Sequence, residues 1–210
     1  MKKRITALVL LTAVLCLVLA GCKVKRFEYE PSVTSVFLTP EGAVRECLMD
    51  TFEESYMSVA GLEKYIKNQI SEYQRNESTQ KVALESADMK DGKVIVRMWY
   101  YTGKDYDGFN YSEGLFTNLR ITPFLDSVEK LTPVIPVPKL LVSVSKRETA
   151  NMDKLVKKAK NYTIAAGTAG EKDAVVYVEG KIEYVSPNIT LIDQNMMKVP
   201  AGQDFVLLYR

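Results

Sequence analysis

The stretch VALESADMKDGKVIVRMWYY, residues 82–101, places two strand-like runs on either side of an Asp-Gly pair. Asp-Gly between such runs is typical of the two-residue turn of a β-hairpin, because both turn residues adopt a positive φ. We therefore predict antiparallel strands over residues 82–89 and 94–101, joined by a turn over residues 90–93.

A helix and a second hairpin are predicted before this stretch. From residue 59 to 74, apolar side chains recur at the spacing of one helix face, and Ser58 is a suitable N-cap. The apolar members are Leu62, Tyr65, Ile66, Ile70 and Tyr73. Strand-like residues 34–38 and 43–52 flank a Thr-Pro-Glu-Gly turn. The order predicts an α+β fold, with an antiparallel sheet built from hairpins and packed against one main amphipathic helix.

The C-terminal part is predicted to be rich in β-structure. Strand candidates lie at residues 140–144, 162–165, 174–178, 181–185, 189–192 and 204–209. Residues 131–138 contain repeated prolines and are expected to be an edge segment or a connection. A basic amphipathic helix over residues 150–160 either packs by its apolar side or lies on a membrane surface. A subdivision of this part near residue 145 is left open.

The N-terminus has the features of an export signal. Basic residues 2–4 precede an apolar run over residues 5–20, which is shorter than the ~20 residues of a membrane-spanning helix. The run ends in Leu19-Ala20-Gly21-Cys22, which resembles the lipobox of bacterial lipoproteins. This resemblance implies cleavage between Gly21 and Cys22, and a diacylglyceryl group on the Cys22 thiol with palmitate as an expected acyl chain.

These features predict three parts of the chain. Residues 1–21 would be a lipoprotein signal peptide, residues 22–32 a lipid-anchored tether, and residues 33–210 an extracytoplasmic α+β domain. The protein would then lie at the outer face of the cell membrane, with the N-terminal lipid in the bilayer. The alternative is an ordinary secretory signal that happens to contain Cys22.

The composition restricts the chemistry of the chain. Its 210 residues include no His, which excludes nucleophile activation by imidazole and His-ligated metal sites. The 28 Lys and Arg are balanced by 26 Asp and Glu, which argues against a nucleic-acid partner. Loss of residues 1–21 would remove three basic residues and change the formal charge from +2 to −1. Apart from the lipidated Cys22, Cys47 would be the remaining cysteine of the mature chain, and we expect it to be a small buried hydrophobic residue.

Several segments together resemble a functionally uncharacterised family of cell-envelope lipoproteins from Gram-positive anaerobic bacteria. The resemblance implies an envelope location and this type of fold, and it implies no activity. The segments that carry it are the lipobox, the Thr34–Leu38 strand, the Pro-Glu-Gly turn, Phe52–Tyr56, the helix from Leu62 to Tyr73, the Asp-Gly hairpin, Tyr106–Asn110 and Gly180–Asn188.

Four oxygen-bearing side chains after the second hairpin form a weak candidate for a metal site. They are Asp105, Asp107, Asn110 and Glu113. Oxygen ligands of this kind suit Ca²⁺, but the spacing of the residues does not match an EF-hand loop. Residues 102–105 also match the start of a capping box, so Asp105 would cap a short helix over residues 106–110. We favour the capping role, and no cofactor is predicted.

Aromatic residues crowd the same region, and four of them are a candidate ligand surface: Trp99, Tyr101, Tyr106 and Tyr111. Exposed rings of this kind could stack on sugars or on a protein partner. The alternative is packing in the core, because strand alternation places Trp99 and Tyr101 on the face opposite to Tyr100.

The sequence leaves two functions open. We expect an envelope protein without enzymatic activity, with a binding or structural role at the cell surface and an envelope protein or a glycan as partner. The alternative is a carboxylate-dependent hydrolase of glycans or of the cell wall, which would need a cleft with two facing acids.

Overall fold

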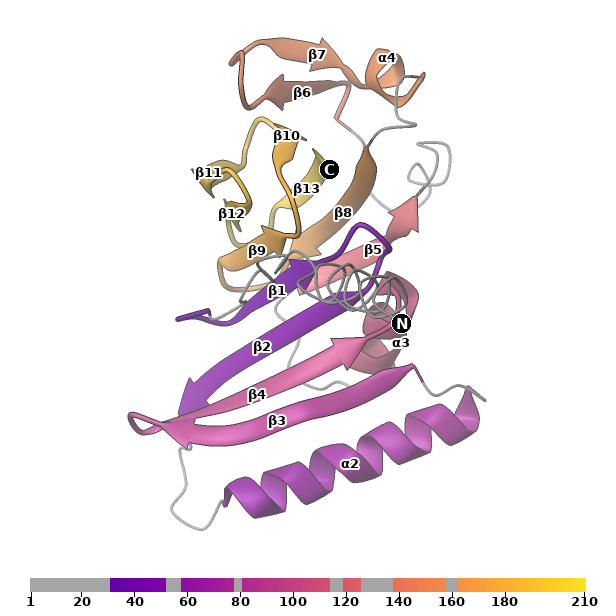
Figure 1. Cartoon of the computed structure of the whole chain (residues 1–210), viewed down its shortest axis with the longest axis vertical. Helices are drawn as coiled ribbons and strands as arrows, with labels where there is room; N and C mark the ends of the chain where they lie inside the picture. The colour runs from indigo at the N-terminus through magenta and orange to yellow at the C-terminus, as the bar shows by residue number, and fades with distance from the viewer. Residues whose placement is uncertain (1–30, 52–57, 78–80, 114–118, 126–137, 158–161) are drawn as a thin grey trace, which may run out of the picture. The chain divides into compact units, whose positions relative to one another are not determined.

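The computed structural model describes residues 31–51, 58–77, 81–113, 119–125, 138–157 and 162–210. Residues 31–210 form one compact unit. Its described part contains two β-sheets and the helices α2 (Val59–Asn76), α3 (Gly103–Glu113) and α4 (Met152–Lys157) (Figure 1). The predicted α+β class is confirmed, with α2 as the main helix. Among the described residues, no helix is both long and apolar enough to cross a bilayer.

The first sheet contains both predicted hairpins. Its strand order is β11-β12-β9-β1-β2-β4-β3. Neighbouring strands are antiparallel except β1 and β9, which run parallel. The strands are β1 (Ser35–Leu38), β2 (Val44–Thr51), β3 (Val82–Lys90), β4 (Lys93–Tyr100), β9 (Ala174–Val178), β11 (Thr190–Asp193) and β12 (Met196–Val199).

The second sheet is antiparallel throughout, in the order β5-β8-β13-β10-β6-β7. Its strands are β5 (Leu119–Leu125), β6 (Leu140–Ser143), β7 (Thr149–Asn151), β8 (Thr163–Ala169), β10 (Ile182–Val185) and β13 (Asp204–Tyr209). Strands from before and after residue 145 occur in both sheets.

The last strand shows how the layers are arranged. Along β13, Phe205, Leu207 and Tyr209 belong to the large core that also contains residues of the first sheet and of α2 and α3. The alternate residues Val206 and Leu208 belong to a second core, which includes Met152 and Leu155 of α4. Both sides of β13 are therefore buried, as expected for a strand whose side chains alternate between two packed faces.

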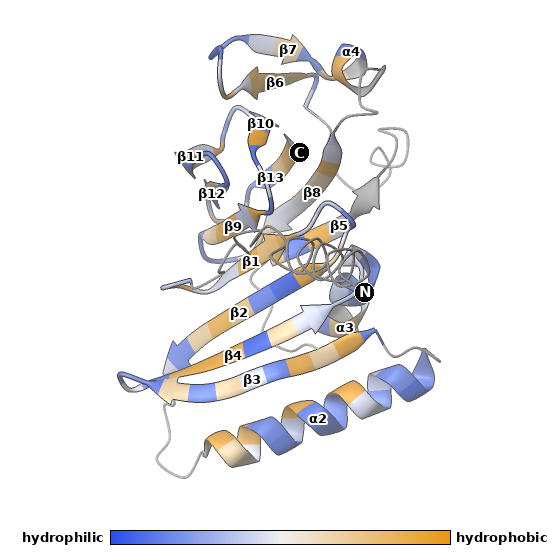
Figure 2. Cartoon of the chain, in the orientation of Figure 1, coloured by the Kyte–Doolittle hydropathy of each residue, from blue (hydrophilic) through white to orange (hydrophobic). Residues whose placement is uncertain are grey.

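Helix α2 forms as the apolar spacing predicts. The side chain of Ser58 accepts a hydrogen bond from the Gly61 N–H at 3.1 Å, which confirms the N-cap. Figure 2 shows hydrophobic positions recurring along the helix, and Ile66, Ile70 and Tyr73 are buried. Tyr65 is 46% exposed, so its assignment to the packed stripe is wrong. It lies about 100° around the helix from Ile66, at the edge of the buried face.

The turns explain two further features of the chain path. Asp91 and Gly92 both have positive φ, 52° and 75°, and form the predicted two-residue turn between β3 and β4. Gly180 has a φ of 106° at the point where the chain leaves β9 in the first sheet and enters β10 in the second. A Cβ atom at Gly180 would lie 2.3 Å from the Arg210 carbonyl oxygen, so the backbones can approach there only with glycine.

Some elements differ from the sequence prediction. Strands β5, β7 and β12 were not predicted. The basic helix predicted over residues 150–160 begins only at Met152, as α4, because residues 149–151 form β7, and residues 158–161 lie outside the described part. In α4, Met152 and Leu155 are buried while Lys154 is exposed, so the apolar side packs against the second sheet. Most of the proline-containing segment, residues 131–137, also lies outside the described residues.

Candidate functional site

The predicted signal cleavage and lipidation residues, Gly21 and Cys22, lie outside the described residues. Cys47 is fully buried, as expected, and burial raises the pKa of its thiol to about 11. A thiol of this kind stays protonated near neutral pH and is a poor nucleophile. The candidate sites therefore lie elsewhere in the folded domain.

The four oxygen-bearing residues face different partners in the fold. Thr102 caps α3: its hydroxyl accepts from the Asp105 N–H at 3.1 Å and donates to the Asp105 carboxylate. The helix is longer than the predicted residues 106–110, and Asp105 lies in its first turn and not at its cap. Asp107 pairs with Arg120 at 3.2 Å, and Asn110 is buried next to Tyr100. Glu113 is in the last turn of α3, and its side chain lies outside the described part. The described residues contain no group of three or more His, Cys, Asp or Glu placed to hold a metal ion.

The predicted aromatic surface is divided by the structure. Tyr106 is completely buried, so its ring cannot contact a ligand at the surface, and its place in the candidate ligand surface is corrected. Tyr101 is 57% exposed and contacts the half-buried Trp99 edge to face, with the ring centroids 6.0 Å apart. The Arg45 guanidinium lies 4.8 Å from the Trp99 ring centroid. The Tyr111 side chain is outside the described residues.

Tyr106 instead belongs to a buried polar cluster around Glu46 of β2, which the sequence analysis missed. The Tyr100 hydroxyl donates to Glu46 Oε2 at 2.9 Å, and the Tyr106 hydroxyl lies 3.3 Å from Glu46 Oε1. Asn110 completes the cluster from α3, and a cavity of about 20 Å³ adjoins the carboxyl. Burial raises the pKa of Glu46 from 4.5 to about 7, although hydrogen bonds from Tyr100, Tyr106 and Asn110 act to lower it.

Burial favours a neutral Glu46, and the hydrogen-bond geometry can accommodate its proton. The Tyr106 hydroxyl has one proton, and its shorter bond, 2.7 Å, goes to the Leu119 carbonyl oxygen. A protonated Glu46 can donate to the Tyr106 oxygen while it accepts from Tyr100, so both carboxyl oxygens have a partner. An ionised Glu46 would compete with the Leu119 carbonyl for the Tyr106 proton. The cluster ties β2, β4 and α3 together.

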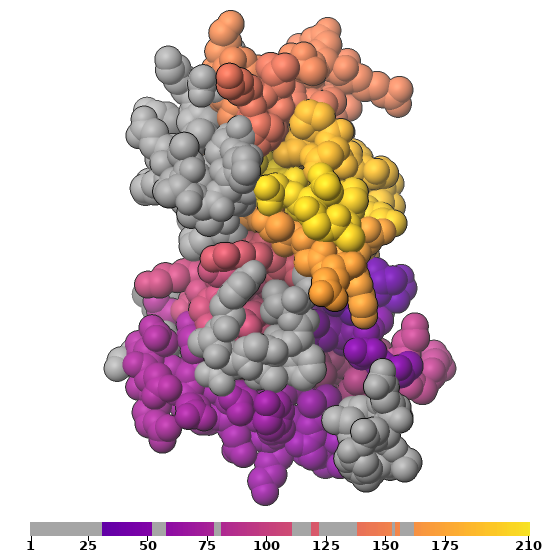
Figure 3. Space-filling model, turned by 180° about the vertical axis from the view of Figure 1, so that it is seen from behind, coloured from indigo at the N-terminus to yellow at the C-terminus, as the bar shows by residue number. Residues whose placement is uncertain are grey.

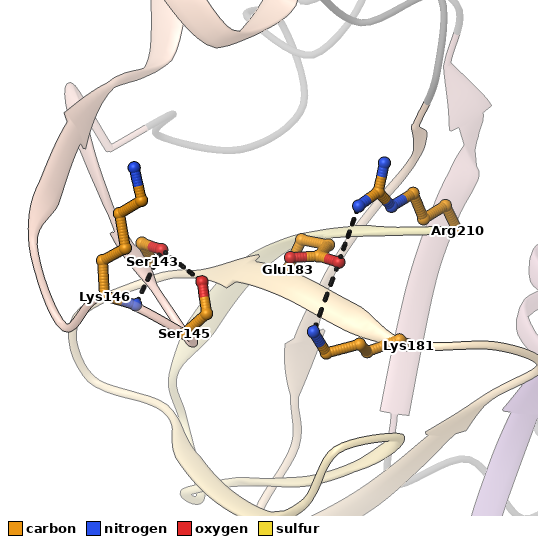
Figure 4. Close-up of polar contacts among 6 residues, drawn as sticks. All are labelled: Ser143, Ser145, Lys146, Lys181, Glu183 and Arg210. Atoms are coloured by element: carbon orange, nitrogen blue, oxygen red, sulfur yellow. Dashed lines mark hydrogen bonds and ion pairs between the residues drawn. The ribbon is translucent and has the colours of Figure 1, made fainter.

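A second buried carboxylate, Glu183 of β10, has a different environment. Its Oε1 atom lies 3.2 Å from Arg210 Nη2 and 3.5 Å from Lys181 Nζ, so two cations neutralise it (Figure 4). A separate hydrogen-bonded group lies at the end of the adjacent β6 and in the turn that follows it. It consists of Ser143, Ser145 and Lys146. Part of the C-terminal segment is at the surface in Figure 3, in yellow; Arg210 is exposed, whereas residues 205–209 are buried. This arrangement is an ion-pair cluster at the end of the second sheet.

A cavity with polar walls lies where β10 ends and β13 begins, and we call it the polar pocket. Its volume is about 270 Å³, slightly below the ~300 Å³ lower end of typical small-molecule sites. Its lining residues are Pro138, Ser186, Asn188, Gly202, Gln203, Asp204 and Phe205. Asn188 and Gln203 are exposed, and Phe205 is buried beneath them in the core.

Hydrogen bonds within its wall hold the polar pocket in shape. Asn188 Nδ2 donates to Gln203 Oε1 at 3.3 Å and to the Asp204 carbonyl oxygen at 3.0 Å. Thr168 donates to Asp204 Oδ1 at 2.6 Å, which fixes the carboxylate. The Ser186 hydroxyl is used by the backbone of Val206. Asp204 is the one acidic residue that lines the pocket among the described residues, so the pocket lacks the facing pair of acids that a hydrolase would need.

Comparison with known proteins gives one distant structural neighbour. No model of a known family matches the chain, and no curated protein matches it. The NMR structure of the folded domain of LppM from Mycobacterium tuberculosis is similar at 11% sequence identity and a TM-score of 0.41, over 87% of this chain and 94% of that chain. Similarity of this degree carries no argument about function, and the proposals below rest on the residues of this chain.

Proposed function

We propose that the protein is a lipid-anchored envelope protein, without enzymatic activity, whose folded domain binds a small polar ligand in the polar pocket. The lipobox-like Leu19–Cys22 segment and the short apolar run before it support the anchor and the position at the outer face of the membrane. The observation that carries the binding role is the pocket, in which several polar side chains converge on one cavity in a fixed geometry. Membership of the lipoprotein family of Gram-positive anaerobes remains part of this proposal.

The anchor is tested by Cys22→Ser in cells of a lipoprotein-processing bacterium. We expect the wild-type chain to take up labelled palmitate, to fractionate with membranes and to be cleaved by protease added to intact cells. The variant should lose the label. Cys16→Ser is the matched control, because this residue lies inside the predicted signal and should not affect labelling. Equal labelling of wild type and Cys22→Ser would contradict the anchor.

The binding role is tested with the full chain in detergent micelles and a defined panel of neutral sugars, amino acids, polyamines and dicarboxylates. We expect at least one class to shift the NMR signals of Asn188, Gln203 and Asp204 in a saturable way. A panel that leaves these signals unchanged at millimolar concentration would overturn the binding role, whatever the result for the anchor.

A further inference from the structure

We infer that the polar pocket takes a neutral, hydroxyl-rich ligand, the chemistry of a single sugar ring. This inference rests on the proposed function, because it names the ligand class of the same pocket. The argument has three steps: the hydrogen-bonding groups left over in the wall, the charge of the wall, and the size of the cavity.

The unused groups of the wall include both donors and acceptors. Asn188 donates its amide protons to Gln203 and to the Asp204 carbonyl oxygen, so its Oδ1 atom remains available as an acceptor. Gln203 accepts through Oε1, and its two Nε2 protons remain as donors. Asp204 Oδ1 accepts from Thr168, which leaves Oδ2 as an acceptor. A hydroxyl group donates and accepts at once, so adjacent hydroxyls on a ring can satisfy all three residues.

The charge of the wall selects against anions, and its amide donors disfavour a cation. Asp204 has no cationic partner among the described lining residues, so an anionic ligand would be repelled and would lose its hydration without compensation. An ammonium group has only donors, and the Nε2 donors of Gln203 would then face a positive charge without an acceptor. A neutral hydroxyl avoids both costs.

The size and the apolar part of the wall agree with one ring. The volume of about 270 Å³ is small for a drug-sized ligand. Pro138 supplies an apolar contribution to the lining, against which the C–H groups of a sugar ring can pack, while the Phe205 ring is buried in the core behind the pocket. Most small-molecule sites combine such an apolar wall with a few convergent polar groups, as this pocket does.

The test compares the full chain with Gln203→Glu in detergent micelles, with glucose, galactose and N-acetylglucosamine as the neutral probes and putrescine as the cationic probe. Replacing the amide by a carboxylate removes both Nε2 donors and adds a charge beside Asp204. We expect sugar binding to fall at least tenfold in Gln203→Glu. Gln194→Glu is the matched control, because Gln194 is an exposed glutamine in the β11–β12 turn and the charge change is the same.

The outcomes separate a failure of the proposed ligand class from a failure of the proposed binding role of the pocket. Sugar binding that is lost in Gln203→Glu and kept in Gln194→Glu supports the inference. Putrescine binding that strengthens in Gln203→Glu, with no sugar binding to wild type, overturns the ligand class and leaves the binding role intact. Absence of any saturable shift at the pocket overturns both. A parallel titration with a soluble tetrasaccharide of the same sugar distinguishes a free sugar from the end of a glycan chain. Equal affinity for the monosaccharide and the tetrasaccharide indicates a chain end, and binding of the monosaccharide alone indicates a free sugar.

Discussion

The two buried glutamates of the domain are stabilised in opposite ways. Glu46 is 3% exposed and is surrounded by the hydroxyls of Tyr100 and Tyr106 and the amide of Asn110. Glu183 is 8% exposed and lies against Lys181 and Arg210, which are themselves about half exposed. Both side chains are buried, yet one carboxyl favours the neutral form and the other forms an ion pair. Burial among neutral partners raises the pKa of Glu46, whereas two cations lie against the Glu183 carboxylate.

The largest expected effect is on the pH dependence of stability, through Glu46. Its pKa of about 7 in the folded chain lies above the ordinary value of 4.5, so the folded state holds the proton more tightly than the unfolded chain. The free energy of unfolding should therefore fall by about 3 kcal/mol as the pH rises from 4.5 to 7, and stay level above that. Glu46→Gln should remove this dependence, because a neutral amide can make both hydrogen bonds of the protonated carboxyl.

Urea unfolding of the full chain in detergent at about pH 5 and about pH 8 measures this difference. We expect Glu46→Gln to be more stable than wild type at the higher pH and similar to it at the lower. Glu41→Gln is the control, because Glu41 is exposed in the turn before β2. Parallel losses of stability with pH in wild type and Glu46→Gln would contradict a neutral Glu46.

The second prediction concerns the hydroxyl that connects Glu46 to the backbone. Tyr106→Phe removes the donor to the Leu119 carbonyl oxygen and leaves two buried polar groups with one partner fewer. We expect a loss of about 1–3 kcal/mol in the free energy of unfolding at acidic pH. Tyr65→Phe is the matched control, because Tyr65 is 46% exposed on α2 and should change stability by less than about 0.5 kcal/mol. An equally small effect of Tyr106→Phe would mean that the Glu46 cluster contributes no net stability.

The same comparison shows what local sequence could predict. The Asp91-Gly92 turn, the apolar spacing of α2 and the apolar run of β13 are properties of neighbouring residues, and these predictions are confirmed. The burial of Glu46 also had a local signal, because Glu46 lies on the same face of β2 as the apolar residues Val44 and Leu48. Its partners Tyr106 and Asn110 lie some 60 residues away in the sequence, on a helix whose position only the tertiary fold determines.

The polar pocket illustrates the limit more clearly. Asn188 lies in a turn and Gln203 just before β13, and neither stretch has a motif. They come together because β10 pairs with β13, which brings residue 188 within hydrogen-bond distance of residues 203 and 204. The number of aromatic residues in this region suggested a ligand surface. Tyr106 instead lies in the core, where its hydroxyl contacts the buried Glu46 carboxyl and the Leu119 carbonyl oxygen.

The smallest expected effect is at Glu183, and its dependence on salt separates the two carboxylates. Glu183→Gln removes an ion pair whose cations are 45% and 57% exposed, so water already screens most of the attraction. We expect a loss of about 0.5–1 kcal/mol in the free energy of unfolding at ~0.02 M NaCl, and a smaller loss at ~1 M NaCl. The effect of Glu46→Gln at high pH should not change with salt, because the described residues that contact this carboxyl are hydroxyl and amide groups and include no cation. A loss of several kcal/mol for Glu183→Gln that salt leaves unchanged would contradict a solvent-screened ion pair at Glu183.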